Sequence, residues 1–258
     1  MASLTQTFKE GFDYAKQDYR LYLIIGVFVV LVNLTSVLIQ LGFRDESIIG
    51  VASIISIIFS FILFGYEINV VKENIEGTND FPELNITDNF ISGIKYIILE
   101  IIYFIIPVII TGIIAAVSVS GIISKYPNIN SMQNIPSDVL ASLVGPLSIA
   151  VIVGIILFIL FGLLAMFGVC RLAKTNSLRE CISFSNSFNE LKKAGVAHSL
   201  GWIILLFIIL FIFSFIIAII SAIPFVGVII SSLLIFPLML FVANSALGKY
   251  YRYEILDE

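Results

Sequence analysis

The chain has 258 residues, of which 59% are hydrophobic and only 12% charged, and its mean hydropathy is +1.09. An average soluble domain is nearer half apolar and a quarter charged, so much of this chain must face lipid rather than water. The net charge of −4 excludes the basic surface typical of nucleic-acid-binding proteins, and no nucleic-acid partner is expected.

Long apolar blocks follow one another along the chain. A helix needs about 20 apolar residues to cross a hydrocarbon core. The blocks are continuous, whereas strands of a membrane barrel alternate polar and apolar residues, so helices are favoured. They cover residues 21–41, 48–71, 94–123, 139–169, 200–220 and 228–247. The sequence therefore predicts an all-α polytopic membrane protein with six transmembrane helices.

The Lys and Arg residues predict the orientation of these helices. When the connections are assigned alternately to two sides, one side holds only Arg44 and Lys125, and the other holds the remaining Lys and Arg residues. Lys and Arg accumulate in cytoplasmic loops. We therefore expect a multi-pass protein of the cell membrane with both termini in the cytoplasm.

Three cytoplasmic segments have the spacing of amphipathic helices, and each precedes an outward-going block. They are residues 4–22, 88–97 and 177–191, with Asp88 expected to cap the second and Ser177 with Glu180 forming a capping-box spacing in the third. Such helices lie in the headgroup region of a bilayer. The aromatic side chains expected to anchor them there are Phe8, Phe12, Phe90, Phe184, Phe188 and Trp202.

The chain also shows signs of internal repetition. The pentapeptide Phe-Ile-Leu-Phe-Gly occurs at residues 61–65 and again at 158–162. We predict a single integral membrane domain, 1–258, built from three hairpins that each follow an interfacial helix. The corresponding repeats would be residues 1–77, 78–175 and 176–258, although apolar runs can also match by chance.

Two carboxylates fall inside the predicted helices. Charged groups at membrane depth are costly and are functional candidates. Glu67 and Glu100 could line a polar cavity that binds a cation or relays a proton, or they could reach the headgroups from within two turns of the interface. Asn33 and Asn244 belong to the same candidate polar site, but buried amides more often join helices by hydrogen bonds.

Catalytic and metal-binding groups are scarce. Two cysteines, Cys170 and Cys181, and one histidine, His198, cannot supply a disulfide framework or a typical zinc site. We expect no catalytic residues, no metal and no cofactor.

The region from Gly65 to Pro107 carries a more specific pattern. Gly-Tyr at 65–66 is followed by Val-Val-Lys at 70–72, Gly77, Phe-Pro-Glu at 81–83, Gly93, Tyr103 and Pro107. This pattern resembles the mainly archaeal membrane family known as domain of unknown function 4013, with Phe81 in place of the more usual Leu. The resemblance implies an archaeal cell-membrane protein and carries over no catalytic residues.

The leading expectation is a non-enzymatic integral membrane protein, acting as a scaffold or a lipid-interacting helical bundle. Membrane lipids are its expected partners, and a second copy or another membrane protein is an open alternative. The alternative function is a small transporter or channel that uses Glu67 and Glu100.

Overall fold

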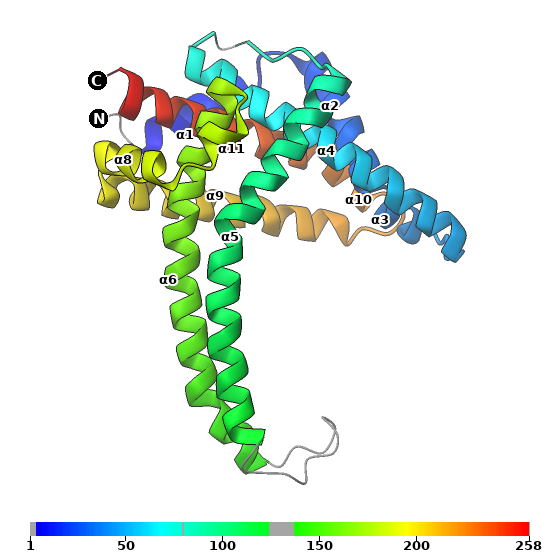
Figure 1. Cartoon of the computed structure of the whole chain (residues 1–258). Coiled ribbons are helices and arrows are strands. Elements are labelled where there is room, and N and C mark those ends of the chain that lie inside the picture. Colours follow the sequence, from blue (N-terminus) through cyan, green and yellow to red (C-terminus); the bar gives the residue numbers. More distant parts are fainter. Residues whose placement is uncertain (1–3, 79, 124–136, 258) are drawn as a thin grey trace. The chain divides into compact units, whose positions relative to one another are not determined.

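The computed structural model describes residues 4–78, 80–123 and 137–257, and these residues form helices and connections without any strand (Figure 1). The helices are α1 (Leu4–Tyr14), α2 (Tyr19–Val32), α3 (Leu34–Gln40), α4 (Glu46–Glu76), α5 (Ile86–Ile123), α6 (Ser137–Thr175), α7 (Leu178–Cys181), α8 (Phe184–Ala194), α9 (Val196–Ser221), α10 (Gly227–Ile230) and α11 (Phe236–Tyr251), with the π-helical segments η2 (Ser231–Ile235) and η3 (Arg252–Leu256).

The long apolar helices confirm an all-α polytopic membrane protein. In the described part of the chain, five helical segments are long and apolar enough to cross a membrane, and α2 with α3 forms a sixth candidate if the bent pair is one span. The five are Glu46–Glu76, Ile86–Ser120, Val144–Thr175, Val196–Ser221 and Gly227–Leu256.

The first predicted transmembrane helix is bent rather than straight. Its two parts, α2 and α3, meet at Asn33 with an angle of 71°. Asn33 donates from Nδ2 to the Val29 carbonyl at 3.0 Å and to Ser232 Oγ at 3.3 Å. Beyond the bend, Gln40 donates to the carbonyl of Ser221 at 2.9 Å. The bend is therefore held by hydrogen bonds to segments about 200 residues away in the sequence.

The chain divides into two compact units. The first contains residues 1–99 and 166–258, and the second contains residues 100–165. The second unit pairs parts of α5 and α6, where Phe104 stacks on Phe158 at a centroid distance of 5.8 Å. In the same unit, Gly154 lies against Thr111, which lets the two helices approach closely. The single domain and the three repeats inferred from the sequence stay predictions.

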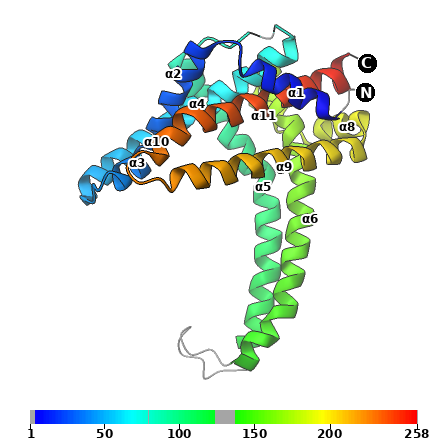
Figure 2. The same cartoon turned by 180° about the vertical axis from the view of Figure 1, so that it is seen from behind.

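In the first unit, α1 packs along α11, and α11 also packs against α4 (Figure 2). Gly11 makes the first contact close, because a Cβ atom there would lie 2.8 Å from the Val242 carbonyl oxygen. Lys249 Nζ lies 3.6 Å from Glu10 Oε2, and the Tyr253 hydroxyl donates to the same oxygen at 2.8 Å. The amino-terminal helix is therefore fastened to the carboxy-terminal one.

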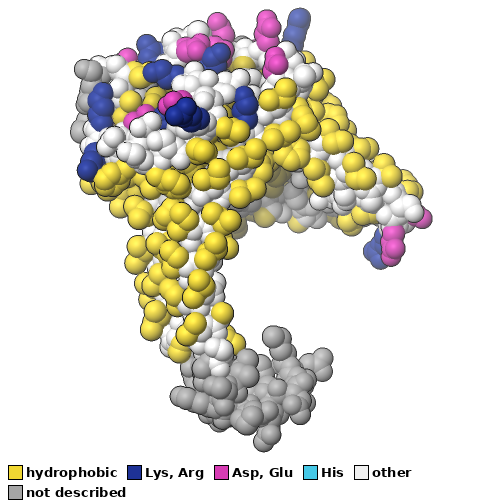
Figure 3. All heavy atoms as spheres, viewed as in Figure 1, with side chains coloured by type: hydrophobic (Ala, Val, Ile, Leu, Met, Phe, Trp, Pro, Cys, Tyr) yellow, Lys and Arg dark blue, Asp and Glu magenta, His cyan; other side chains and the backbone are white. Residues whose placement is uncertain are grey.

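We call α1, α8, η3 and residues 77–78 and 80–85 the polar layer of the first unit. Figure 3 shows charged side chains gathered over these segments, whereas apolar side chains cover much of the surface of the spans. Large apolar residues are exposed along the spans, among them Ile54 and Val51 in α4 and Phe211 and Phe215 in α9. Exposed apolar surface of this extent is expected where helices face lipid.

The helix starts differ in part from the sequence-based predictions. The segment from residue 88 is not a separate helix, because α5 runs without interruption from Ile86 to Ile123. Asn85 rather than Asp88 caps it, since Asn85 Oδ1 accepts the Asp88 backbone N–H at 3.2 Å. The side chain of Ser177 makes no capping bond, and Ser183 caps α8 instead by accepting the Asn186 N–H.

Candidate functional site

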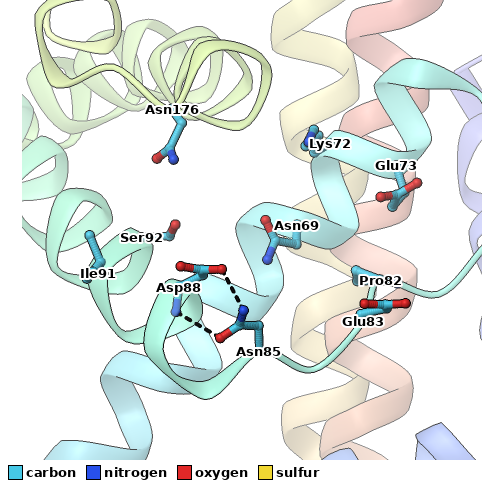
Figure 4. Close-up of a pocket in the computed structure, with 10 residues that line it drawn as sticks. All are labelled: Asn69, Lys72, Glu73, Pro82, Glu83, Asn85, Asp88, Ile91, Ser92 and Asn176. Carbon is cyan, nitrogen blue, oxygen red and sulfur yellow. Dashed lines mark hydrogen bonds between the residues drawn. The ribbon is translucent and has the colours of Figure 1, made fainter.

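A polar cavity of about 490 Å³ lies in the first unit, where the end of α4 meets the start of α5 (Figure 4). Its walls come from the last turns of α4, the connection after it, the first turns of α5 and the connection after α6. The described residues that line it are Asn69, Lys72, Glu73, Pro82, Glu83, Asn85, Asp88, Ile91, Ser92 and Asn176.

Contacts with the core hold the connection between α4 and α5 in place. Gly77 ends α4 with φ of +78°, a left-handed conformation that glycine adopts without strain. Phe81 stacks on Phe241 at 4.5 Å, and the Tyr14 hydroxyl donates to the Asp80 carbonyl at 2.8 Å. Burial raises the pKa of Tyr14, so its hydroxyl keeps the donated proton. These contacts fix Pro82 and Glu83 in the wall of the cavity.

Below the cavity, α4 and α5 cross at two glycines. A Cβ atom on Gly65 would lie 1.7 Å from the Asn89 carbonyl oxygen, and one on Gly93 would lie 1.8 Å from the Phe61 carbonyl oxygen. Real Cβ atoms do not approach so closely, so only glycine allows this contact. One turn above the crossing, Asn69 donates to Asn89 Oδ1 at 2.7 Å. The two helices are therefore packed tightly next to the cavity residue Asn69.

Hydrogen bonds orient several carboxylates of the cavity. Asn85 donates from Nδ2 to Asp88 at 2.6 Å (Figure 4). The Thr78 hydroxyl donates to Glu73 Oε2 at 2.5 Å. Lys72 lies 3.9 Å from Glu76 in the same helix, a partly exposed pair of small energetic value.

The far wall depends on the connection after α6. Asn176 has φ of +52°, a left-handed conformation that Asn tolerates better than most residues. Lys95 Nζ donates to both the backbone carbonyl and the side-chain oxygen of Asn176, at 2.9 and 2.8 Å. This contact joins segments 81 residues apart and sets Asn176 at the edge of the cavity.

A second polar cluster holds α7 and α8 against the end of α6. Arg171 is only 5% exposed, and it donates to the carbonyls of Glu180 and Ser183 as well as forming an ion pair with Glu190. The Tyr251 hydroxyl donates to the other oxygen of Glu190 at 2.8 Å. Burial raises the pKa of Glu190, and the bonds from Tyr251 and Arg171 act against that shift. The cluster is internally satisfied and packs elements together.

The polar residues predicted at membrane depth do not line this cavity. Glu67 is half-buried within hydrogen-bonding reach of Asn244, which also donates to the Leu240 carbonyl at 3.0 Å. Glu100, also half-buried, begins the second unit, whereas Glu67 belongs to the first. Asn33 joins helices, as described above. The structure therefore links Glu67 to Asn244 but does not assign the four residues to one site.

The aromatic residues expected at the bilayer interface occupy several environments. Phe8 and Trp202 are buried and stack on each other at 5.2 Å, and Trp202 also donates from Nε1 to Thr7 at 3.0 Å. These two side chains fasten α1 to α9 inside the protein rather than facing lipid. Phe12, Phe90 and Phe184 are half-buried, and Phe188 is exposed with Lys192 over its ring.

The cavity residues were not proposed as a site from the sequence. Most lie in charged cytoplasmic segments in which the sequence predicted interfacial helices rather than a binding site, and their convergence depends on contacts over long sequence distances. One signal was present, however, because Lys72, Pro82 and Glu83 belong to the pattern that suggested the family. Within the described part of the chain, no three His, Cys, Asp or Glu residues are arranged to hold a metal ion.

A comparison with protein-family models matches residues 48–222, which is more than half of the chain and contains every lining residue of the cavity. Comparisons with curated proteins and with solved structures gave no match. The matching model also agrees with the family suggested by the pattern from Gly65 to Pro107. The chain therefore belongs to the family described as "Protein of unknown function (DUF4013)".

Proposed function

We propose that this protein is a non-enzymatic integral membrane protein that binds lipids through its polar layer. The observation that carries the proposal is the position of the cavity at the ends of two candidate spans, Glu46–Glu76 and Ile86–Ser120. Where a span ends, the hydrocarbon gives way to headgroups. A polar cavity at that depth is within reach of a lipid headgroup whose chains lie along the apolar helices.

The distribution of Lys and Arg supports a cytoplasmic position for the polar layer, because all but Arg44 and Lys125 fall on that side of the predicted topology. Helices α1 and α8 lie on this side and could also act as a scaffold for other membrane proteins or for a second copy. Lipid binding and scaffolding by the same layer are compatible.

The cavity lacks the arrangement expected of a hydrolytic active site. Its described lining contains neither His nor Cys, and the Ser92 hydroxyl has no hydrogen-bond partner in the described residues. An activated serine needs a neighbouring base. Glu67 and Glu100, on which the transport alternative depends, are not among the lining residues.

Lipid binding is tested by delipidating the purified full chain in detergent and measuring its thermal unfolding midpoint as phospholipids are added back. A ligand that binds only the folded state raises the midpoint with concentration. We expect phospholipids to do so and diacylglycerol with the same acyl chains to have little effect. No rise with phospholipids of any headgroup would contradict the proposal, as would ion-dependent flux in proteoliposomes that Glu100→Gln abolishes.

A further inference from the structure

The charges around the cavity are unbalanced. Glu73, Glu83 and Asp88 come from three different segments, and Lys72 is the cation among the described lining residues. The Lys72 ammonium is itself held near Glu76, which does not line the cavity. The cavity therefore has a net negative lining, which favours a ligand that carries positive charge.

The neutral polar groups of the lining also offer acceptors. Ser92 is only 7% exposed, its hydroxyl has no hydrogen-bond partner in the described residues, and it points toward the space between Asp88 and Asn176 (Figure 4). Asn69 uses its Nδ2 group to bond Asn89, which leaves its side-chain oxygen as an acceptor. Because neither the Ser92 hydroxyl nor the Asn69 oxygen is used by a neighbouring protein group in the described residues, both remain available to a ligand in the cavity.

From these observations we propose that the cavity binds a primary ammonium group, such as that of an aminophospholipid headgroup. An ammonium supplies three hydrogen-bond donors, which suits a lining of carboxylates with Ser92 and Asn69 as further acceptors. A divalent metal fits less well, because the described carboxylates do not gather into a group of three around one point.

This inference rests on the proposed lipid-binding function and specifies the headgroup. Lys72 lies in the same wall as Glu73 and could meet the phosphate of a zwitterionic headgroup while the carboxylates hold its ammonium. A soluble amine has the same ammonium chemistry without the acyl chains. The two sources differ in whether the apolar surface of α4 and α5 contributes to binding.

The test measures dissociation constants by native mass spectrometry on the full chain in detergent, with phosphatidylethanolamine and phosphatidylcholine of identical acyl chains. The trimethylated headgroup of phosphatidylcholine keeps the charge but has no N–H donors. We expect tighter binding of phosphatidylethanolamine. Glu83→Gln should weaken that binding by about tenfold, because it removes one charge-assisted hydrogen bond to the ammonium. Glu83 is exposed, so its substitution should not affect folding.

Two further variants make the result specific. Ser92→Ala removes the hydroxyl that faces the cavity and should also reduce the preference for phosphatidylethanolamine. Glu180→Gln removes an exposed carboxylate outside the cavity and should leave binding unchanged. Competition by free ethanolamine distinguishes the two sources of the ammonium group. Full displacement of phosphatidylethanolamine by ethanolamine at the same concentration supports a soluble amine as the ligand. Weak displacement supports the lipid.

Equal binding of the two lipids would overturn the ammonium site while leaving the lipid-binding function intact. Tighter binding of anionic phosphatidylglycerol, or unchanged affinity in both Glu83→Gln and Ser92→Ala, would overturn it as well. Failure of every phospholipid to bind would instead contradict the proposed function itself.

Discussion

Two glycines set the separation of α4 and α5, and with it the floor of the cavity. At Gly65 and Gly93 the backbone of one helix touches the other, so there is no room for a side chain. Small residues at helix crossings are the usual means by which membrane helices approach closely. The same positions belong to the pattern that identified the family, which gives that pattern a physical meaning.

Gly65→Ala should therefore reduce stability. Its Cβ atom would overlap the Asn89 carbonyl, so the helices must separate, at a cost of about 1–3 kcal/mol in the free energy of unfolding. Unfolding in mixed micelles with increasing SDS measures this cost. Gly50→Ala is the matched control in the same helix, because no atom lies within 4 Å of its Cβ position and alanine favours helix. Equal stability of the two variants would contradict the close crossing.

Among the elements, α7 and α8 depend on Arg171 for their attachment to α6. The guanidinium reaches carbonyls at Glu180, Cys181 and Ser183 and the carboxylate of Glu190. Because one side chain serves several backbone acceptors, it adds polar contacts to the buried apolar residues Cys181 and Leu191. An exposed arginine could not have this role.

Arg171→Met should destabilise the protein by about 3 kcal/mol, the lower end of the range for a buried pair, because it leaves the mostly buried Glu190 carboxylate without its cation. Glu190 already has a raised pKa, and losing Arg171 should raise it further. Glu190 in the folded variant then binds a proton more tightly than in the unfolded chain. The loss of stability should therefore shrink as the pH falls toward the ordinary carboxyl pKa of about 4.3. The free energy of unfolding, measured between pH 5 and 8, tests both the size of this loss and its decrease at low pH. The control is Arg179→Met, because Arg179 is exposed.

For the whole molecule, orientation in the membrane is the main prediction still to be tested. The native cysteines are poor reporters, because both are buried and burial raises the pKa of the Cys181 thiol to about 11. At neutral pH that thiol is protonated and reacts slowly. Cysteines introduced at exposed positions avoid this difficulty.

Ser47→Cys lies near the start of α4 and Lys9→Cys on α1, and both positions are exposed. If both termini are cytoplasmic, a membrane-impermeant maleimide should label Ser47→Cys in intact cells and Lys9→Cys only after the cells are opened. The reverse pattern would invert the topology and place the polar layer outside. The unaltered protein serves as the control for slow labelling of the native cysteines.

The sequence by itself determined the membrane class, the helical content and the approximate spans, because hydropathy and helix formation are local properties. The block at 48–71, for example, falls within α4 (Glu46–Glu76). Local pattern also indicated the family through the residues around Gly65 and Pro82.

Only the tertiary structure decided where the helix of residues 21–41 bends and which polar residues share a cavity. The bend at Asn33 depends on Ser232, and the cavity depends on Tyr14 holding Asp80 and on Lys95 holding Asn176. Each of these contacts joins segments more than 60 residues apart. No local pattern encodes such pairings, so the sequence did not show that these charged segments form the walls of one candidate site.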